Sequence, residues 1–183
     1  MKKKKLLVVV DMQNDFVTGS LGTKEAQAIV PNVVKKIETY QKNEDCIFVT
    51  KDCHYEDYLN TSEGQYLPIK HCLFGTWGFN LVSDVKDQLD KGDYVLVEKE
   101  TFGSTELIKQ IKNIIKNNIE ISSIELAGLC FDICVLSNAV MIKNSFPNIK
   151  VFINTSCTSA TSKEAFDATK VLMKNLQIEE INE

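Results

Sequence analysis

The amino-acid sequence predicts an α/β protein in which a mainly parallel, doubly wound sheet lies between two layers of helices. Short apolar runs rich in β-branched residues, such as Leu6–Val10 and Cys46–Thr50, have the composition of strands that are buried on both faces. Amphipathic helical patterns, such as Lys24–Lys42, alternate with these runs along the chain. This alternation favours parallel strands joined by right-handed crossovers, as in Rossmann-like three-layer α/β/α folds.

The composition is that of one ordinary globular domain. We expect residues 1–183 to form a single domain, because 44% of the residues are hydrophobic, 25% are charged, and no linker or repeat interrupts the pattern. The net charge of -4 gives no electrostatic argument for a nucleic-acid or membrane partner. The six cysteines have no disulfide-like spacing, and Leu6–Val10 is too short an apolar run to export the chain or span a bilayer. We therefore expect reduced thiols and a cytoplasmic protein.

The first third of the chain is expected to contain a strand, a loop and a long helix. The strand Leu6–Val10 ends abruptly at Asp11, and residues Asp11–Gly22 are expected to form a loop. The helix Lys24–Lys42 has apolar residues at helical spacing. We expect Pro31 to mark a first turn, because proline has no N–H to donate inside a helix.

The middle of the chain continues the alternation around one irregular segment. After the strand Cys46–Thr50, the segment Tyr55–Asn80 shows no sustained period and is rich in aromatic residues, which predicts an ordered functional loop. A third strand is expected at Tyr94–Val97. A helix is expected at about Thr105–Asn117, with Ser104 as its N-cap.

Three further strands and two helices are expected in the last third. Ser123–Ala127 reads as a buried strand, and a helix begins near Asp132. Lys150–Ile153 and Ile178–Asn182 are the remaining expected strands. Between them, Thr161 and Glu164 have the spacing of a capping box for a helix whose apolar face would contain Phe166, Val171, Leu172 and Leu176.

Cys134 lies where the apolar pattern breaks at Gly128 and restarts as a helix. A thiol in the first helical turn lies near the positive end of the helix dipole and near unpaired N–H groups, and both favour the nucleophilic thiolate. A single cysteine at such a junction is more often a small buried hydrophobic residue. The functional interpretation therefore depends on its neighbours in space.

Polar residues follow the ends of several predicted strands. Asp11, Asp52 with His54, Lys99 and Cys134 each lie at or shortly after a different strand end. Parallel strands deliver their carboxyl ends to one edge of the sheet, where ligands bind. An acid, a pair of metal-ligand types, an amine and a thiol are thus expected to converge on one crevice.

Several motifs together resemble those of the isochorismatase-like cysteine hydrolases, and within that family the nicotinamidases. The resemblance covers nearly the full length and rests on the motifs Asp11–Phe16, Lys51–His54, Pro68 with His71–Cys72, Lys99 and Gly128–Cys134. It implies a catalytic triad of Asp11, Lys99 and Cys134. Asp11 would serve as the base, Lys99 would hold Asp11 and offset its charge, and Cys134 would attack an amide carbonyl.

The same resemblance implies how the oxyanion is stabilised. The backbone N–H groups of Cys130 and Cys134 would donate to it. A non-proline cis peptide would lie at Leu129–Cys130, a bond that persists only where the surrounding fold enforces it.

A second group of residues has the character of a metal site. Asp52 and His54 precede the irregular segment, and His71 lies within it. His54 and His71 are the only two histidines of the chain. A carboxylate and two imidazoles suit one divalent ion, with zinc expected first and iron or manganese as alternatives. Glu63 is either a fourth ligand or an ordinary solvated residue. In the family, this site also binds the ring nitrogen of the substrate.

The substrate-binding aromatics depart from the family pattern. Many nicotinamidases have a tryptophan where Leu67 precedes Pro68 here, and Lys70 is an extra residue before the second histidine. Phe16 is expected on one face of the substrate ring, with Tyr66 or Trp77 on the other, although each aromatic is as readily a core residue. These departures affect ring selectivity more than hydrolysis.

The leading functional hypothesis is hydrolysis of nicotinamide to nicotinate and ammonia through a thioester, for NAD salvage, with pyrazinamide as a further substrate. The nearest rival hypothesis is a related cysteine hydrolase acting on a carbamoyl or ureido compound. An isochorismatase is less favoured, because vinyl-ether chemistry does not require the nucleophilic thiol. Two less favoured hypotheses are a thiol redox sensor using Cys130 and Cys134 and a catalytically silent ligand-binding protein. A homo-oligomer is compatible with the sequence.

Overall fold

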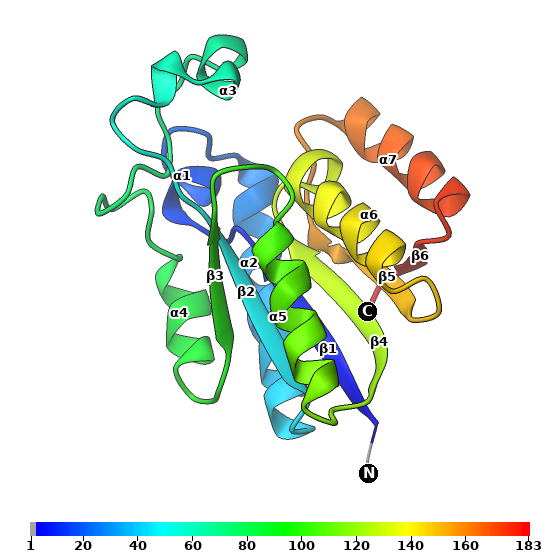
Figure 1. Cartoon of the computed structure of the whole chain (residues 1–183). Helices are drawn as coiled ribbons and strands as arrows, with labels where there is room; N and C mark the ends of the chain where they lie inside the picture. The colour runs from blue at the N-terminus through cyan, green and yellow to red at the C-terminus, as the bar shows by residue number, and fades with distance from the viewer. Residues whose placement is uncertain (1–2) are drawn as a thin grey trace.

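A computed structural model describes residues 3–183 and contains one parallel six-stranded sheet (Figure 1). The strand order is β3-β2-β1-β4-β5-β6. The strands are β1 (Lys4–Val10), β2 (Cys46–Asp52), β3 (Val95–Lys99), β4 (Ile121–Gly128), β5 (Lys150–Thr158) and β6 (Glu179–Ile181). The strands β1 to β5 extend beyond the expected runs or closely match them, and β6 is shorter than expected. The predicted parallel α/β fold is confirmed.

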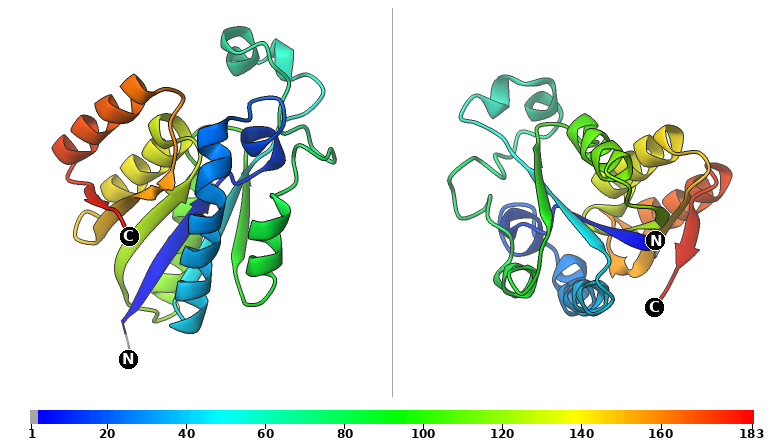
Figure 2. Two further views of the ribbon diagram at one scale, coloured as in Figure 1. Left: turned by 180° about the vertical axis from the view of Figure 1, so that it is seen from behind. Right: turned by 60° about the horizontal axis from the view of Figure 1, so that its bottom comes forward.

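Helices cover both faces of this sheet. The view from behind in Figure 2 shows α2 (Lys24–Lys42) and α4 (Ser83–Leu89) lying across one face. The opposite face is covered by α5 (Thr105–Lys116), α6 (Leu136–Ser145) and α7 (Lys163–Asn175). None of the helices in residues 3–183 combines the length and apolar character needed to cross a lipid bilayer.

The central strands are buried on both sides, as the apolar runs predict. Along β1, Leu6, Val8 and Val10 point into the core beneath α5, α6 and α7. Leu7 and Val9 alternate with them and pack beneath α2 and α4. All five side chains are 0% exposed, so β1 is the strand on which both hydrophobic cores are built.

The expectation that Pro31 occupies a first turn is wrong. The helix α2 begins at Lys24, where Thr23 Oγ1 caps the N–H of Ala26, and Pro31 lies in its interior. Proline removes one intrahelical hydrogen bond. The helix continues past it because a long apolar face, which includes Val33 and Ile37, packs onto the sheet.

Two expectations about α7 are wrong. Ser162, not Thr161, is its N-cap, because Ser162 Oγ accepts from Ala165 N at 3.0 Å. Three residues of the expected apolar face, Val171, Leu172 and Leu176, are 64%, 50% and 40% exposed. The helix lies over the edge of the sheet, where a narrow stripe suffices, and its buried residues are Thr169 and Met173.

Short helices occur where the sequence predicts loops. The segment after β1 contains α1 (Asn14–Val17), and the segment after β2 contains a 3₁₀ turn (Tyr58–Asn60) and α3 (Ser62–Tyr66). The sequence pattern does not predict the helix α4 either. These elements are too short to show a hydrophobic period, and tertiary contacts stabilise them.

Candidate active site

Backbone register brings the ends of four strands to one edge of the sheet. Val10 pairs with Thr50 of β2 and with Gly128 of β4, and Asp52 pairs with Lys99 of β3. The residues at and just beyond these positions therefore lie together. The structure places Asp11, Asp52, Lys99 and Cys134, which the sequence predicts to converge, in one buried group.

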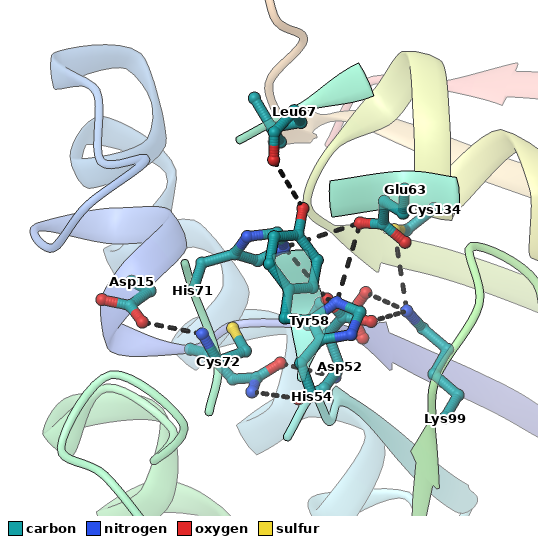
Figure 3. Close-up of polar contacts among 12 residues, drawn as sticks. Asp15, Asp52, His54, Tyr58, Glu63, Leu67, His71, Cys72, Lys99 and Cys134 are labelled. Atoms are coloured by element: carbon teal, nitrogen blue, oxygen red, sulfur yellow. Dashed lines mark hydrogen bonds and ion pairs between the residues drawn. The ribbon is translucent and has the colours of Figure 1, made fainter. Parts of the chain in front are cut away.

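Lys99 is at the centre of this group. Its Nζ lies 2.7 Å from Asp11 Oδ2. It also lies 3.2 Å from Asp52 Oδ1 and 3.6 Å from Cys134 Sγ, and Figure 3 shows these three residues together. Although burial lowers the pKa of Lys99, the charges of Asp11, Cys134 and Asp52 raise it well above its ordinary value. Lys99 is therefore a fixed cation that contacts both carboxylates and the thiol.

The carboxyl group of Asp11 is 0% exposed, and within residues 3–183 only one of its two oxygens accepts a hydrogen bond. Thr50 Oγ1 donates to Asp11 Oδ1 at 2.6 Å, whereas Oδ2 has the Lys99 ammonium at 2.7 Å without an aligned hydrogen bond. Burial raises the pKa of Asp11 above the usual value, and Asp52 adds to this, while Lys99 and Thr50 oppose it. A carboxyl group with a raised pKa is suited to exchange a proton.

The expectation that Cys134 is favoured as a thiolate is not supported by its surroundings. Burial raises the pKa of the Cys134 thiol well above the usual value, and the Asp11 carboxylate raises it further, while Lys99 opposes both. Cys134 lies within a π-helical turn, Phe131–Val135, that leads into α6. Desolvation beside a carboxylate therefore acts against the thiolate that the helix terminus favours.

The turn before Cys134 has an unusual backbone. Gly128 has a φ of +114°, and a Cβ at this position would overlap the main chain of Val10. The peptide bond Leu129–Cys130 is cis, as the resemblance implies. Among residues 3–183, no backbone carbonyl accepts a hydrogen bond from the Cys130 N–H, which is one of the two predicted oxyanion donors.

The two cysteines of this turn lie on different sides of the sheet. Cys134 belongs to the core beneath α5, α6 and α7, whereas Cys130 packs against the core beneath α2 and α4. Both are free thiols. Burial raises the pKa of Cys130 to about 12. Their packing on opposite faces of the sheet does not favour a redox pair.

Asn138, which the sequence analysis missed, ties the Cys134 helix to the loop after Lys99. It is fully buried, and its Nδ2 donates to Cys134 O at 2.8 Å and to Phe102 O at 3.0 Å. Its Oδ1 accepts from Ser104 N at 3.0 Å. No sequence signal distinguishes it, since asparagine within a helix is usually exposed.

Beside the triad, four predicted metal ligands form a compact cluster. One ligand atom from each of Asp52, His54, Glu63 and His71 lies within 4.8 Å of the others (Figure 3). Glu63 is carried by α3, and its Oε1 is 3.6 Å from His54 Nε2 and 3.7 Å from His71 Nε2. Two imidazoles and two carboxylates are a ligand set for a divalent transition ion.

The orientation of both imidazoles fits a metal ion. His71 Nδ1 lies 2.8 Å from Ile69 O, a contact that directs the His71 Nε2 lone pair into the cluster. His54 Nε2 is buried without a hydrogen-bond partner, even though Asp52 Oδ2 is only 2.8 Å away. A buried nitrogen that faces carboxylates without an aligned hydrogen bond is the arrangement expected of a metal ligand.

Asp52 links the metal-ligand cluster to the triad. Its Oδ2 faces His54 and His71, while its Oδ1 faces Lys99. Burial raises the pKa of Asp52, but the close contacts with the two histidines and the charge of Lys99 lower it to below its ordinary value. Asp52 is thus an anion shared by the two halves of the site.

Aromatic side chains surround the two histidines. The Tyr58 ring, which the sequence analysis missed, lies 4.6 Å from the His54 ring and 5.0 Å from the His71 ring. The Tyr58 hydroxyl donates to Leu67 O at 2.9 Å. This hydrogen bond joins the main chain of the predicted substrate-binding residue Leu67 to a ring that lies beside both histidines. The Phe16 ring lies 5.4 Å from the His71 ring.

The other two expected aromatics are placed differently. Tyr66, at the end of α3, is 90% exposed, and Trp77 is 60% exposed. Within residues 3–183, neither ring stacks on either histidine. Phe16 is therefore the expected aromatic that the structure brings to the histidines.

Comparison with protein families agrees with this site. Residues 5–179 match the model of the isochorismatase domain. The chain belongs to the isochorismatase family. The isochorismatase-family protein PncA of Bacillus subtilis is 30% identical over 151 residues, which cover 75% of this chain and 77% of that protein. The nicotinamidase of Saccharomyces cerevisiae is 29% identical over 122 residues, or 52% of this chain, and the match spans 56% of the yeast protein.

Solved structures share the fold over almost the whole chain. A pyrazinamidase/nicotinamidase of Streptococcus mutans has a TM-score of 0.85 at 25% identity, covering 97% of this chain and 100% of that chain. A zinc-bound pyrazinamidase of Pyrococcus horikoshii has a TM-score of 0.82 at 24% identity, with 98% and 99% covered. An N-carbamoylsarcosine amidase of Thermoplasma acidophilum has a TM-score of 0.75 at 21% identity, with 98% and 96% covered. This isochorismatase-family fold thus serves more than one amidase.

Proposed function

We propose that this protein is a nicotinamidase that hydrolyses nicotinamide to nicotinate and ammonia. The observation that carries the proposal is the contact of Asp52 with both Lys99 and the two histidines, because it joins a thiol triad to a site for a ring nitrogen. The likeness to the yeast nicotinamidase supports the same substrate. Pyrazinamide, a similar amide on a ring with nitrogen, is a further proposed substrate.

The first half of the proposed reaction is acylation of Cys134. As Cys134 Sγ attacks the amide carbon, Asp11 takes the thiol proton, a role for which its raised pKa suits the carboxylate. The carbon–nitrogen bond then breaks, and Asp11 returns the proton to the leaving nitrogen as ammonia departs. Lys99 keeps Asp11 in place throughout.

The second half of the reaction is hydrolysis of the thioester. Asp11 takes a proton from water as the water oxygen attacks the thioester carbon. The carbon–sulfur bond then breaks, Asp11 returns this proton to Cys134 Sγ to restore the thiol, and the nicotinic acid leaves and ionises to nicotinate. In both halves, we propose the N–H groups of Cys130 and Cys134 as donors to the oxyanion. The free Cys130 N–H supports this role.

The metal-ligand cluster fits one divalent ion, and we propose that Asp52, His54, Glu63 and His71 hold it. Zinc is the proposed ion, supported by the zinc in the Pyrococcus horikoshii relative, with iron and manganese as alternatives. When bound, the ion supplies an electrophilic site for the pyridine nitrogen of the substrate. Phe16 would lie against one face of the ring, next to His71.

A carbamoyl or ureido amidase is the second candidate function. The structural likeness to an N-carbamoylsarcosine amidase favours it, because the same fold carries that activity. Such a substrate has no ring nitrogen. The two candidates therefore differ in whether turnover depends on the histidine cluster.

The deciding experiment is ammonia release by zinc-loaded protein from nicotinamide, pyrazinamide and a panel of N-carbamoyl amino acids. We expect rapid release from nicotinamide, loss of release in Cys134→Ala, and a strong decrease after chelation. Cys157→Ala is the matched control, because Cys157 is also a buried free thiol but lies outside the triad. Release from the carbamoyl compounds alone would replace nicotinamidase with the second candidate.

We further propose that the reaction serves NAD recycling, since nicotinate is a precursor and nicotinamide a breakdown product of this cofactor. A homo-oligomer is compatible with the structure. Size-exclusion chromatography with light scattering measures the oligomeric state directly.

A further inference from the structure

We propose that Gln13 and Asp15, neighbours of the triad residue Asp11 in sequence, are positioning residues that hold the main chain beside two metal ligands. This inference rests on the proposed metal site. Gln13 holds the main chain of Asp52, and Asp15 holds the main chain directly after His71. Neither residue lies in the ligand cluster itself.

The Gln13 side chain forms hydrogen bonds with both backbone groups of Asp52. Its Oε1 accepts from Asp52 N at 2.7 Å, and its Nε2 donates to Asp52 O at 2.8 Å and to Phe79 O at 3.0 Å. The side chain is 0% exposed. A buried amide whose donors and acceptor are all used fixes its partners, because any movement leaves buried polar groups unpaired.

The position of Asp52 matters more than that of an ordinary ligand. One of its carboxylate oxygens faces Lys99 and the other faces the two histidines. A rotation of the Asp52 backbone would therefore disturb both contacts. Gln13 opposes this rotation, because it bonds the N–H and the C=O of Asp52 at once.

Asp15 performs the same task at the other end of the cluster. Its Oδ2 accepts from Cys72 N at 2.8 Å, the first N–H after His71. Cys72 has a φ of +47°, a conformation that costs free energy for a non-glycine residue and must be held by its surroundings. A charged acceptor makes one of the stronger hydrogen bonds that can hold it.

The space around Asp15 is shaped for its carboxylate. A Cβ at Gly78 or at Gly19 would overlap the Asp15 side chain. Neither glycine has a left-handed φ, so close approach rather than backbone conformation is the reason for glycine at these positions. In this space, Asp15 Oδ2 faces Cys72 N and Asp15 Oδ1 accepts from Ser20 N at 3.3 Å.

Gln13 and Asp15 belong to one short segment, and this segment positions both the metal ligands and the triad. The segment starts at Asp11, the triad carboxylate, and continues into α1 (Asn14–Val17). Gln13 N donates to Asp11 O at 2.8 Å, which closes a tight turn between the two. The same few residues therefore place the base and hold the main chain at Asp52 and Cys72.

The test is the zinc affinity of the folded protein, measured by competition with a chromophoric chelator and so without any assay of turnover. We expect Gln13→Leu and Asp15→Ala each to weaken zinc binding by about 10- to 100-fold, as for other residues that orient metal ligands. Asp15→Asn keeps an acceptor for the Cys72 N–H and should restore most of the affinity. Gly78→Ala, which replaces neither positioning residue, should weaken binding by displacing the Asp15 carboxylate.

The matched control is Gln88→Leu. Gln88 is also a buried glutamine, and its Nε2 donates to Gln41 Oε1 at 2.8 Å, away from the ligand cluster. A purely structural role for Gln13 predicts equal loss of metal-free stability in both variants and no change in zinc affinity, which would overturn the proposal. Should Gln13→Leu not fold, Gln13→Asn, one methylene shorter, tests the same contacts.

The outcomes separate this inference from the proposed function. If the wild type binds zinc and Gln13→Leu, Asp15→Ala and Gly78→Ala bind it with the same affinity, the positioning role is refuted and the proposed metal site is not. Wild type that binds no zinc refutes the metal site on which the inference rests. Weakened binding in these variants, rescue by Asp15→Asn and unchanged binding in Gln88→Leu support it.

Discussion

Lys99 Nζ lies 2.7 Å from Asp11 Oδ2, and the two side chains are only 2% and 0% exposed. Removing one partner of such a buried pair leaves an uncompensated charge, which costs more than the pair contributes. The pair also connects the proton-exchanging carboxyl group to a cation that contacts the thiol. Stability and activity are therefore expected to respond differently when one or both partners are replaced.

Lys99→Met is expected to destabilise the fold by about 3–5 kcal/mol and to abolish ammonia release, because it leaves Asp11 buried without its cation. The double variant Asp11→Asn/Lys99→Met removes both charges of the pair and should recover part of the stability, because Asp52 still lacks its contact with Lys99, but none of the activity. Urea denaturation and an ammonia assay measure the two effects. Lys86→Met, which breaks an exposed pair with Asp90, should cost less than about 1 kcal/mol. Equal stability of the single and double variants would contradict this account.

The raised pKa of the Cys134 thiol predicts a particular pH dependence of its reactivity. In substrate-free protein, modification of Cys134 by iodoacetamide should be slow at pH 7 and increase about tenfold per pH unit through pH 9, since only the thiolate reacts. Peptide mapping by mass spectrometry follows the reaction, with Cys134→Ser as the blank. A rate that is already constant below pH 7 would show that Cys134 is a resting thiolate.

The raised pKa values of the buried thiols also predict loss of stability in alkali. Burial raises the pKa of Cys134, of Cys130 to about 12, and of Cys72 further still, so the folded state keeps protons that the unfolded state releases near pH 8.5. The stabilising effect is complete below the unfolded pKa and is lost as the pH rises toward the folded pKa. Each such thiol lowers the free energy of unfolding by about 1.4 kcal/mol per pH unit in that window. Urea denaturation between pH 7 and pH 10.5 measures the slope, and a flat profile would contradict the prediction.

Glu63 is expected to be a metal ligand because α3 places its carboxylate against both histidines. Glu63→Gln should weaken zinc binding at least about tenfold, or about 1.4 kcal/mol, in chelator competition. Glu56→Gln is the control, because Glu56 lies in the same segment but is exposed and pairs with Lys70. Equal affinities of the two variants would place Glu63 among the solvated residues.

Asn138→Leu is expected to lower both stability and turnover. The replacement leaves two buried backbone groups, at Cys134 and Ser104, and one part-buried group, at Phe102, without their partner, at a cost of about 2–4 kcal/mol in urea denaturation. Turnover should decrease because the Cys134 turn is no longer held to the loop after Lys99. Asn144→Leu, which removes an exposed hydrogen bond to Val140 on the same helix, should change neither quantity measurably.

Sequence patterns were most reliable where many residues repeat the same signal. The apolar runs at β1, β2 and β4 and the long amphipathic pattern of α2 predict the parallel sheet, because burial on both faces leaves a composition that few other structures share. The polar residues at strand ends predict the site, since parallel topology forces them together. Short elements such as α3 and α4 carry too few residues for such a signal.

Expectations failed where a single residue was read without its surroundings. Pro31 lies inside α2 because packing onto the sheet outweighs one lost hydrogen bond. Thr161 bonds to Asp132 instead of capping α7, with Thr161 N 3.0 Å from Asp132 Oδ1. At Cys134, burial and the neighbouring Asp11 raise the pKa of the thiol, which acts against the effect expected of the helix terminus. Each outcome depends on a neighbour that is distant in sequence.

The sequence by itself determined the fold class, the isochorismatase-family resemblance and the residue types that gather at the carboxyl edge of the sheet, because periodicity and strand-end placement are local properties of the chain. The tertiary structure alone decided which charged and polar groups of these residues contact one another. Asp52 faces Lys99 with one oxygen and the histidines with the other, and Gln13 and Asp15 hold the main chain behind this arrangement. Such contacts join residues far apart in sequence, and their energies depend on distance, orientation and burial.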